Sequence, residues 1–190
     1  DASIKHNGEY MPRLAASAEV IEKLDHLGMI STWKKQPAPD LKQAFMEGAD
    51  TFAFIKSAAI QEGLEDTLAN YVYHLPHYRG GFKIGRLFSE LLSVLNDFCK
   101  SSLSEAMAIL VVINERLYSK TDEDLFYYYM GKQTLTQFRQ ANGYKTGDYV
   151  KNWAGKEDNE HLTDMLENGV TIEYLPEALE HAYNLAVKHA

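Results

Sequence analysis

Residues 44–55 read AFMEGADTFAFI, and this stretch places two carboxylates, Glu47 and Asp50, among apolar side chains. In a helix, residues three apart lie on one face, so both acids point the same way with little polar company. Like charges about 5 Å apart repel by roughly 3 kcal/mol at an effective dielectric near 20, and burial adds a desolvation cost. The stretch therefore predicts a helix whose acids are neutralised by a cation.

A second acidic pair, Glu19 and Glu22, lies upstream in the sequence AEVIEKLDH. Acidic pairs at this spacing arise by chance in a chain with 27 acids, and most of them mark solvated helix faces. Here the preceding alanines favour close helix approach, which sets the pair apart from that background. A divalent cation between the two pairs would turn their repulsion into attraction. All-oxygen ligation favours Mg²⁺, with Mn²⁺ as the alternative, over zinc.

The rest of the chain has the pattern of an all-α helical bundle, in a single domain over residues 1–190. Apolar residues recur at helical spacing, and β-branched alternation is almost absent. Between residues 63 and 85 we expect a short helix and then a loop rich in Pro and Gly, with His74 and His77 in that loop. The predicted helices span about residues 13–27, 41–62, 86–100, 102–119, 122–143, 157–169 and 175–190.

Charge and composition exclude several classes of function. The net charge of −8 disfavours a nucleic-acid footprint, because phosphate backbones attract basic surfaces. The chain contains no run of 18 apolar residues, which a membrane span would require, so we expect a cytoplasmic protein. For a viral protein this would be the host cytoplasm, and in a eukaryote the nucleus is also possible. The single Cys99 cannot form an internal disulfide and is expected in the core.

A basic and aromatic window lies in the C-terminal half, although the chain as a whole is acidic. Its cations alternate with Phe138, Tyr144, Tyr149 and Trp153, a composition that suits a small phosphorylated ligand. We expect Phe138 and Trp153 to pack in the core rather than to stack on a ligand. The cations of the window are Lys132, Arg139, Lys145, Lys151 and Lys156.

Two motifs together resemble a known family. The order Glu-x-x-Glu, a linker containing STWKKQPAPD, then Glu-x-x-Asp is similar to the metal signature of the all-α nucleoside triphosphate pyrophosphatases. Residues 129–159, YMGKQTLTQFRQANGYKTGDYVKNWAGKEDN, resemble the C-terminal signature of the dimeric dUTPases of trypanosomatids, some bacteria and phages. The resemblance runs from about residue 15 to the end of the chain.

This resemblance implies a homodimeric all-α enzyme that uses Mg²⁺ to hydrolyse dUTP to dUMP and pyrophosphate, accepts dUDP, and so keeps uracil out of DNA. Metal-binding helices would span about residues 13–62, and the nucleotide-binding motif region about residues 121–162. Glu22 would also orient or deprotonate the attacking water, and Asn159 would contact the deoxyribose. The implied metal ligands are Glu19, Glu22, Glu47 and Asp50. The implied substrate-binding residues are Lys132, Arg139, Tyr144, Lys151 and Asn159.

The chain departs from the family pattern where relatives recognise uracil. Gln133 and Thr136 stand where the family has Asn, and Thr cannot offer both an amide donor and a carbonyl acceptor. Relatives also begin with a further helix before the position of Asp1, so we expect either a truncated chain or a base pocket built differently. Two alternatives stay open: a pyrophosphatase for another nucleotide such as dCTP, and a non-catalytic dUTPase-like nucleotide binder.

Overall fold

The computed structural model describes residues 10–30, 38–81, 83–91, 93 and 102–187. These residues are mostly helical, which confirms the all-α class, and they include one two-stranded hairpin that the sequence pattern did not predict. The elements are α1 (Pro12–His26), α2 (Leu41–Glu62), α3 (Glu65–Leu68), α4 (Tyr71–Gly81), η2 (Ile84–Arg86), α6 (Leu103–Tyr118), α7 (Asp122–Ala141), β1 (Asn152–Trp153), β2 (Lys156–Glu157), α8 (Asp158–Glu167) and α9 (Leu175–Val187).

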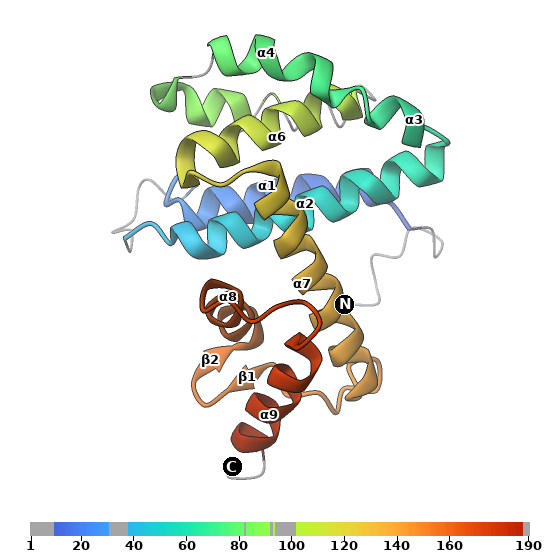
Figure 1. Cartoon of the computed structure of the whole chain (residues 1–190), viewed down its shortest axis with the longest axis vertical. Coiled ribbons are helices and arrows are strands. Elements are labelled where there is room, and N and C mark those ends of the chain that lie inside the picture. The colour runs from blue at the N-terminus through green and yellow to red at the C-terminus, as the bar shows by residue number, and fades with distance from the viewer. Residues whose placement is uncertain (1–9, 31–37, 82, 92, 94–101, 188–190) are drawn as a thin grey trace.

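Helices α1 and α2 run antiparallel through the middle of the molecule (Figure 1). The carboxylate of Asp40 accepts hydrogen bonds from two backbone N–H groups in the first turn of α2, as an N-cap residue does. At its other end α2 stops at Gly63, which has φ +65°. These limits confirm the predicted helix 41–62. Arg13, at the start of α1, pairs with Glu62, at the end of α2, which fixes the antiparallel alignment.

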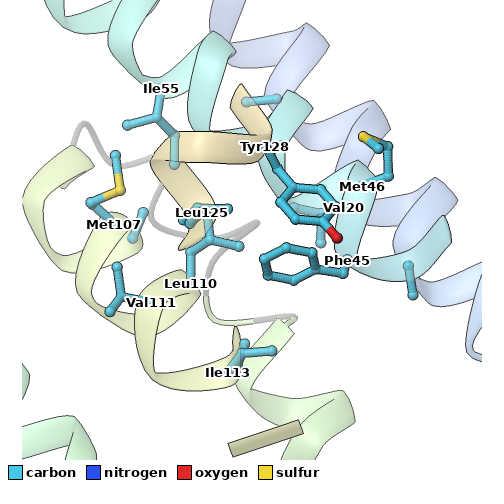
Figure 2. Packing of buried hydrophobic residues seen from close by; sticks show 14 of the residues in the cluster. Val20, Phe45, Met46, Ile55, Met107, Leu110, Val111, Ile113, Leu125 and Tyr128 are labelled. Atoms are coloured by element: carbon cyan, nitrogen blue, oxygen red, sulfur yellow. The ribbon is translucent and has the colours of Figure 1, made fainter. Parts of the chain in front are cut away.

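The apolar face of α2 packs against α6 and the first half of α7 (Figure 2). Phe45 meets Tyr128 edge to face, with ring centroids 4.8 Å apart. Met46 and Leu125 are buried in the same cluster. Burial of each large apolar side chain contributes about 1.5–3 kcal/mol, so this packing fixes the rotation of α2 about its axis. The acids of α2 therefore have a defined direction, toward α1 and the second half of α7.

One local prediction was wrong in detail. Helix α4, with Pro76 inside it, occupies the segment predicted as a loop, so His74 and His77 are helical. Packing of α4 on α6, which buries Leu75, outweighs the helix-breaking tendency of proline. At the start of α6, Ser102 is the N-cap residue, but its hydroxyl donates to the Glu105 carboxylate instead of accepting a backbone N–H bond.

The second half of α7 carries a smaller unit made of the hairpin, α8 and α9, at the bottom of Figure 1. Trp153 on β1 is fully buried, and its indole N–H donates to the carbonyl of Val150 at 2.8 Å. Phe138 packs beside it, with ring centroids 5.9 Å apart, so the packing roles predicted for both rings are confirmed. The hairpin turns at Ala154 and Gly155, both with positive φ. Alanine rarely adopts that conformation, which explains why no turn was predicted there.

Some predictions concern parts of the chain outside the described residues. They are the Trp-Lys-rich part of the linker, the core position of Cys99 and most of the helix expected over residues 86–100, of which residues 87–91 and 93 are helical. Among the helices that the structure does describe, none combines the length and the apolar character that a membrane crossing requires.

Candidate active site

Three carboxylates from the two central helices meet at one point. Ligand oxygens of Glu19 on α1 and of Glu47 and Asp50 on α2 lie within 4.8 Å of one another. Glu47 is buried, whereas Glu19 and Asp50 are half-buried. The expected meeting of the two acidic pairs is therefore observed for three of the four residues. Glu22 is exposed on α1 and lies outside this group of three.

The surroundings of these acids disfavour three simultaneous negative charges. Burial, together with the charge of Asp50 and a hydrogen bond with Glu47, raises the pKa of Glu19 to about 9. Burial also raises the pKa of Glu47, although the charge of Lys132 opposes this shift. Without a cation, the protein therefore tends to hold a proton within the group. A divalent cation would remove both the repulsion and the need for that proton.

Lys132 connects the acidic group to the C-terminal half of the chain. Its side chain reaches from the middle of α7, with Nζ 2.5 Å from Oδ2 of Asp50 and 3.0 Å from Oδ1 of Asn159. Lys132 is only 5% exposed, so its charge depends on these two partners. The structure thus brings together one metal-ligand candidate and two substrate-binding candidates.

Arg139, one of the expected phosphate-binding residues, is held by an acid that the sequence analysis did not select. Both oxygens of Asp158 accept hydrogen bonds from its guanidinium, at 2.7 and 2.8 Å, and Tyr149 donates its hydroxyl to the same carboxylate. Burial would raise the pKa of Asp158, but the bonds and charge of Arg139 keep it below the ordinary value. Arg139 also donates to Asn159 Oδ1 at 3.1 Å. Asp158 therefore fixes the direction of Arg139 toward Asn159.

A cleft of about 480 Å³ opens beside the acidic group, between α1, the start of α2 and the start of α8. Glu22 and Glu47 line one side, and Lys151 and Asn159 line the other. This arrangement places Glu22, outside the group of three acids, opposite two expected substrate-binding residues. The remaining lining residues are His26, Asp40, Gln43, Glu157 and Glu160.

Tyr144 is the expected substrate-binding residue that stands apart. It follows α7 in an exposed turn, and it is not among the residues that line the cleft. The guanidinium carbon of Arg139 lies 5.9 Å from the centre of its ring. Tyr144 thus borders the site through Arg139 rather than facing the acids.

A comparison with protein families decides the identity of the fold. A family model described as dUTPase matches residues 2–144, which is most of the chain. The chain belongs to the all-α dUTPase family. A comparison with curated proteins gives no match.

Membership of the dUTPase family supports dUTP diphosphatase activity with a nucleotide as the substrate. The matched span includes the acids of α1 and α2 together with Lys132, Arg139 and Tyr144. Lys151 and Asn159 lie beyond it, so for these two residues the geometry of the cleft is the main support. Asp158 also lies beyond it.

The residues at the site fit a divalent metal ion of the kind used by dUTPases. The three clustered acids offer only oxygen ligands, which magnesium and manganese prefer. The ligand oxygens already lie within 4.8 Å of one another, so small side-chain rotations would bring them within reach of one cation. The raised pKa values of Glu19 and Glu47 show that the group lacks enough positive charge of its own.

Asp158 is the main residue that sequence reasoning missed. In the sequence it appears only as the middle residue of Glu-Asp-Asn, whose Asn carried the resemblance. Its contact with Arg139 depends on how the hairpin folds back against α7, and no sequence pattern predicts that geometry. The burial of Asp158 could not be predicted either, because an acid in the first turn of a helix is usually exposed to solvent.

Proposed function

We propose that this chain is a magnesium-dependent enzyme that hydrolyses dUTP, and also dUDP, with the metal held by Glu19, Glu22, Glu47 and Asp50. Family membership supports hydrolysis of dUTP, and the clustering of Glu19, Glu47 and Asp50 supports a divalent metal. Glu22 lines the adjoining cleft, which supports its inclusion, and the use of dUDP follows from the resemblance alone. Manganese is the expected substitute metal, because it prefers the same oxygen ligands.

One observation carries the proposal: the acids of the N-terminal half and the cations of the C-terminal half meet at Asp50. Lys132 contacts Asp50 directly, and through Asn159 it is connected to Arg139. A nucleotide with its phosphates beside the acids would therefore meet Lys132 and Asn159 at once. In this pose the amide oxygen of Asn159 already accepts hydrogen bonds from Lys132 and Arg139, so its Nδ2 is the atom that would contact the deoxyribose.

The charge of the cleft explains why a metal is needed. Five carboxylates and one lysine line it among the described residues. That lysine, Lys151, lies 3.0 Å from Glu157, which neutralises much of its charge. A triphosphate would be repelled from such a surface, because like charges a few ångströms apart interact unfavourably even when screened. Bound divalent cations would reverse this repulsion and attract the phosphates.

In hydrolysis of dUTP, water adds to a phosphorus atom and the bridging oxygen leaves, which yields dUMP and pyrophosphate. A bound metal would lower the pKa of the attacking water and would stabilise the negative charge on the phosphoryl oxygens. Glu22 lies in the cleft next to the acidic group, where its carboxylate accepts the proton of the attacking water. Lys132 and Arg139 hold the phosphates, and Asp158 keeps Arg139 in place.

A substrate panel tests the proposal. The purified chain is incubated with Mg²⁺ and with dUTP, dTTP, dCTP or UTP in turn, and the nucleoside monophosphate formed is measured by chromatography. We expect fastest loss of dUTP, release of pyrophosphate rather than phosphate, and no reaction in EDTA. Equal rates for dUTP and dTTP would remove the claim of uracil specificity.

A dCTP pyrophosphatase is the second candidate, and Thr136 favours it. Thr136 is exposed on α7, one turn before Arg139, and it replaces the Asn that relatives use for uracil. A hydroxyl can donate one bond and accept others, so it does not impose the donor and acceptor pattern of uracil. Faster loss of dCTP than of dUTP in the same panel would support this candidate.

We further propose that the enzyme is a homodimer. An apolar cleft of about 490 Å³ lies between α2, α3, α6 and α7, and Phe126 at its edge is about half exposed. Large exposed apolar surfaces of this kind usually mark contacts between proteins. Sedimentation equilibrium measures the mass directly, and a monomer at micromolar concentration would contradict the proposal.

A further inference from the structure

A buried lysine that the proposed mechanism does not use lies behind the acidic group. Lys23 follows Glu22 in the sequence and comes one helical turn after Glu19, yet it is fully buried. Its Nζ donates to the carbonyl oxygen of Ala44 at 2.9 Å and to Oδ1 of Asn114 at 3.1 Å. Among the described residues it forms no ion pair with a carboxylate. A buried charge without such a pair costs several kcal/mol, so its presence calls for a reason.

The structure provides a socket for this ammonium on α2. Gly48 has no side chain, and a Cβ atom at this position would lie 2.9 Å from Nζ of Lys23 and 3.3 Å from Oδ1 of Asn114. Glycine inside a helix costs about 1 kcal/mol relative to alanine. Helix α2 therefore gives up some stability at a position where the ammonium needs space.

The socket lies on the turn of α2 that carries a metal-ligand candidate. Ala44 comes three residues before Glu47, and Gly48 comes directly after it. Lys23 itself lies on the turn of α1 that carries Glu19 and Glu22. Its side chain thus connects the two acid-bearing turns.

Helix α6 completes the junction. Asn114 is fully buried, and the ring of Tyr118 lies with its centre 4.8 Å from Nζ of Lys23, a favourable cation–π geometry. Burial lowers the pKa of Lys23 to about 7, and the negative charge of Glu47 opposes this shift. The hydrogen bonds to Ala44 and Asn114, together with the ring of Tyr118, hold the ammonium beside the turn of α2 that carries Glu47.

We propose that Lys23 is a positioning residue for the metal site, whose buried ammonium fixes the separation of the α1 and α2 turns that carry the ligands. This inference rests on the metal site of the proposed function. A purely structural role predicts unchanged metal affinity on substitution, with stability equal or higher, because replacing a buried charged group by an apolar side chain of similar volume is often neutral or stabilising. The two roles therefore differ in their effect on metal affinity.

The experiment measures Mn²⁺ binding to the full chain without nucleotide, by the electron paramagnetic resonance signal of free Mn²⁺. The variants are Lys23→Met, which removes the charge, and Gly48→Ala, which fills the socket from the other side. We expect each to weaken Mn²⁺ binding by at least about tenfold, the range seen when residues that orient metal ligands are lost. The midpoint of thermal unfolding without metal should stay equal or rise for Lys23→Met.

The double variant and a control make the test specific. The two substitutions disrupt the same contact between Lys23 and α2. The Mn²⁺ affinity of the double variant should therefore be no lower than that of whichever single variant binds more weakly, so the two effects are not additive. Lys120→Met is the control: its ammonium also lies over aromatic rings, 5.5 Å from the centre of Tyr128, but it does not contact the socket. We expect this variant to bind Mn²⁺ like the wild type.

The outcomes separate this inference from the proposed function. If the wild type binds Mn²⁺ and Lys23→Met binds it equally well, the positioning role is wrong and the metal site stands. Additive losses in the double variant would also overturn the role. If the wild type binds no Mn²⁺, the metal site itself is wrong and the inference is overturned with it. Should Lys23→Met fail to fold, Gly48→Ala alone decides: unchanged affinity refutes the role.

Discussion

Replacement of Glu47 by glutamine should change the stability of the metal-free protein and its metal affinity in opposite directions. The oxygens of Glu47, Glu19 and Asp50 lie within 4.8 Å of one another. At that distance two carboxylates repel by roughly 1 kcal/mol in water-like surroundings and by roughly 3.5 kcal/mol at an effective dielectric of 20. Burial and the charge of Asp50 disfavour the ionised form of Glu47, whose pKa is raised. A neutral amide of the same shape avoids that cost.

The expected gain in the free energy of unfolding of the metal-free protein is about 1–3 kcal/mol, because attraction to Lys132 is lost along with the repulsion. For a chain of this size that corresponds to a rise of roughly 2–12 °C in the unfolding midpoint. With one carboxylate ligand missing, added Mg²⁺ should no longer raise the midpoint. The kcat/KM for dUTP should fall at least about 100-fold, the upper end of the loss seen when a residue that merely orients a ligand is removed.

Thermal unfolding in EDTA and in excess Mg²⁺, at mildly alkaline pH, measures both effects on the same sample. Glu173→Gln is the matched control, since the same change is made at an exposed residue in a turn, and this residue is neither in the acidic group nor in the lining of the cleft. It should unfold and respond to Mg²⁺ like the wild type. If Glu47→Gln keeps the Mg²⁺ response and the activity, Glu47 is not a metal ligand and the electrostatic reasoning fails.

Three further predictions address the rest of the site. Lys132→Met should lower kcat/KM for dUTP by roughly 10- to 150-fold in steady-state assays, because a charge-assisted hydrogen bond contributes about 1.5–3 kcal/mol. Asp158→Asn should lower the free energy of unfolding by about 3–5 kcal/mol in urea titrations, because Arg139 is left without its carboxylate. In EDTA, stability should fall as pH rises from about 5 to 7, because the folded state keeps a proton on Glu19 that the unfolded chain has lost. Above pH 7 the lowered pKa of Lys23 acts in the opposite sense, so the fall should flatten in pH-dependent thermal unfolding.

Local signals in the sequence predicted α2 well and α4 badly, because only in α4 does packing against another helix override the local signal. Asp40 and Gly63 are residues whose own chemistry starts and ends a helix, so the limits of α2 could be derived without knowing its neighbours. Pro76 also sends a local signal, but packing on α6 overrides it. Where the fold depends on contacts between distant segments, the sequence pattern alone misleads.

The candidate site shows the same division. The apolar context of Glu47 and Asp50 predicted burial and a cation. Glu47 is buried, Asp50 is half-buried, and both cluster with Glu19, whereas the cation stays a prediction. The separate position of Glu22 could not be predicted, because the angle between α1 and α2 decides which acid of a pair reaches the partner helix. Asp158 was missed for a similar reason, since its partner Arg139 lies on another element.

Lys132 shows why the acidic group depends on the whole fold rather than on α1 and α2 alone. Asp50 receives its counter-charge from α7, and the hydrogen bonds to Asp50 and Asn159 stabilise the buried side chain of Lys132. The two central helices in isolation would hold three repelling acids and would expose the apolar face that α6 and α7 cover. The acidic group is therefore stable only when the C-terminal half is folded against it, which would link the proposed metal binding to the same residues that would hold the phosphates.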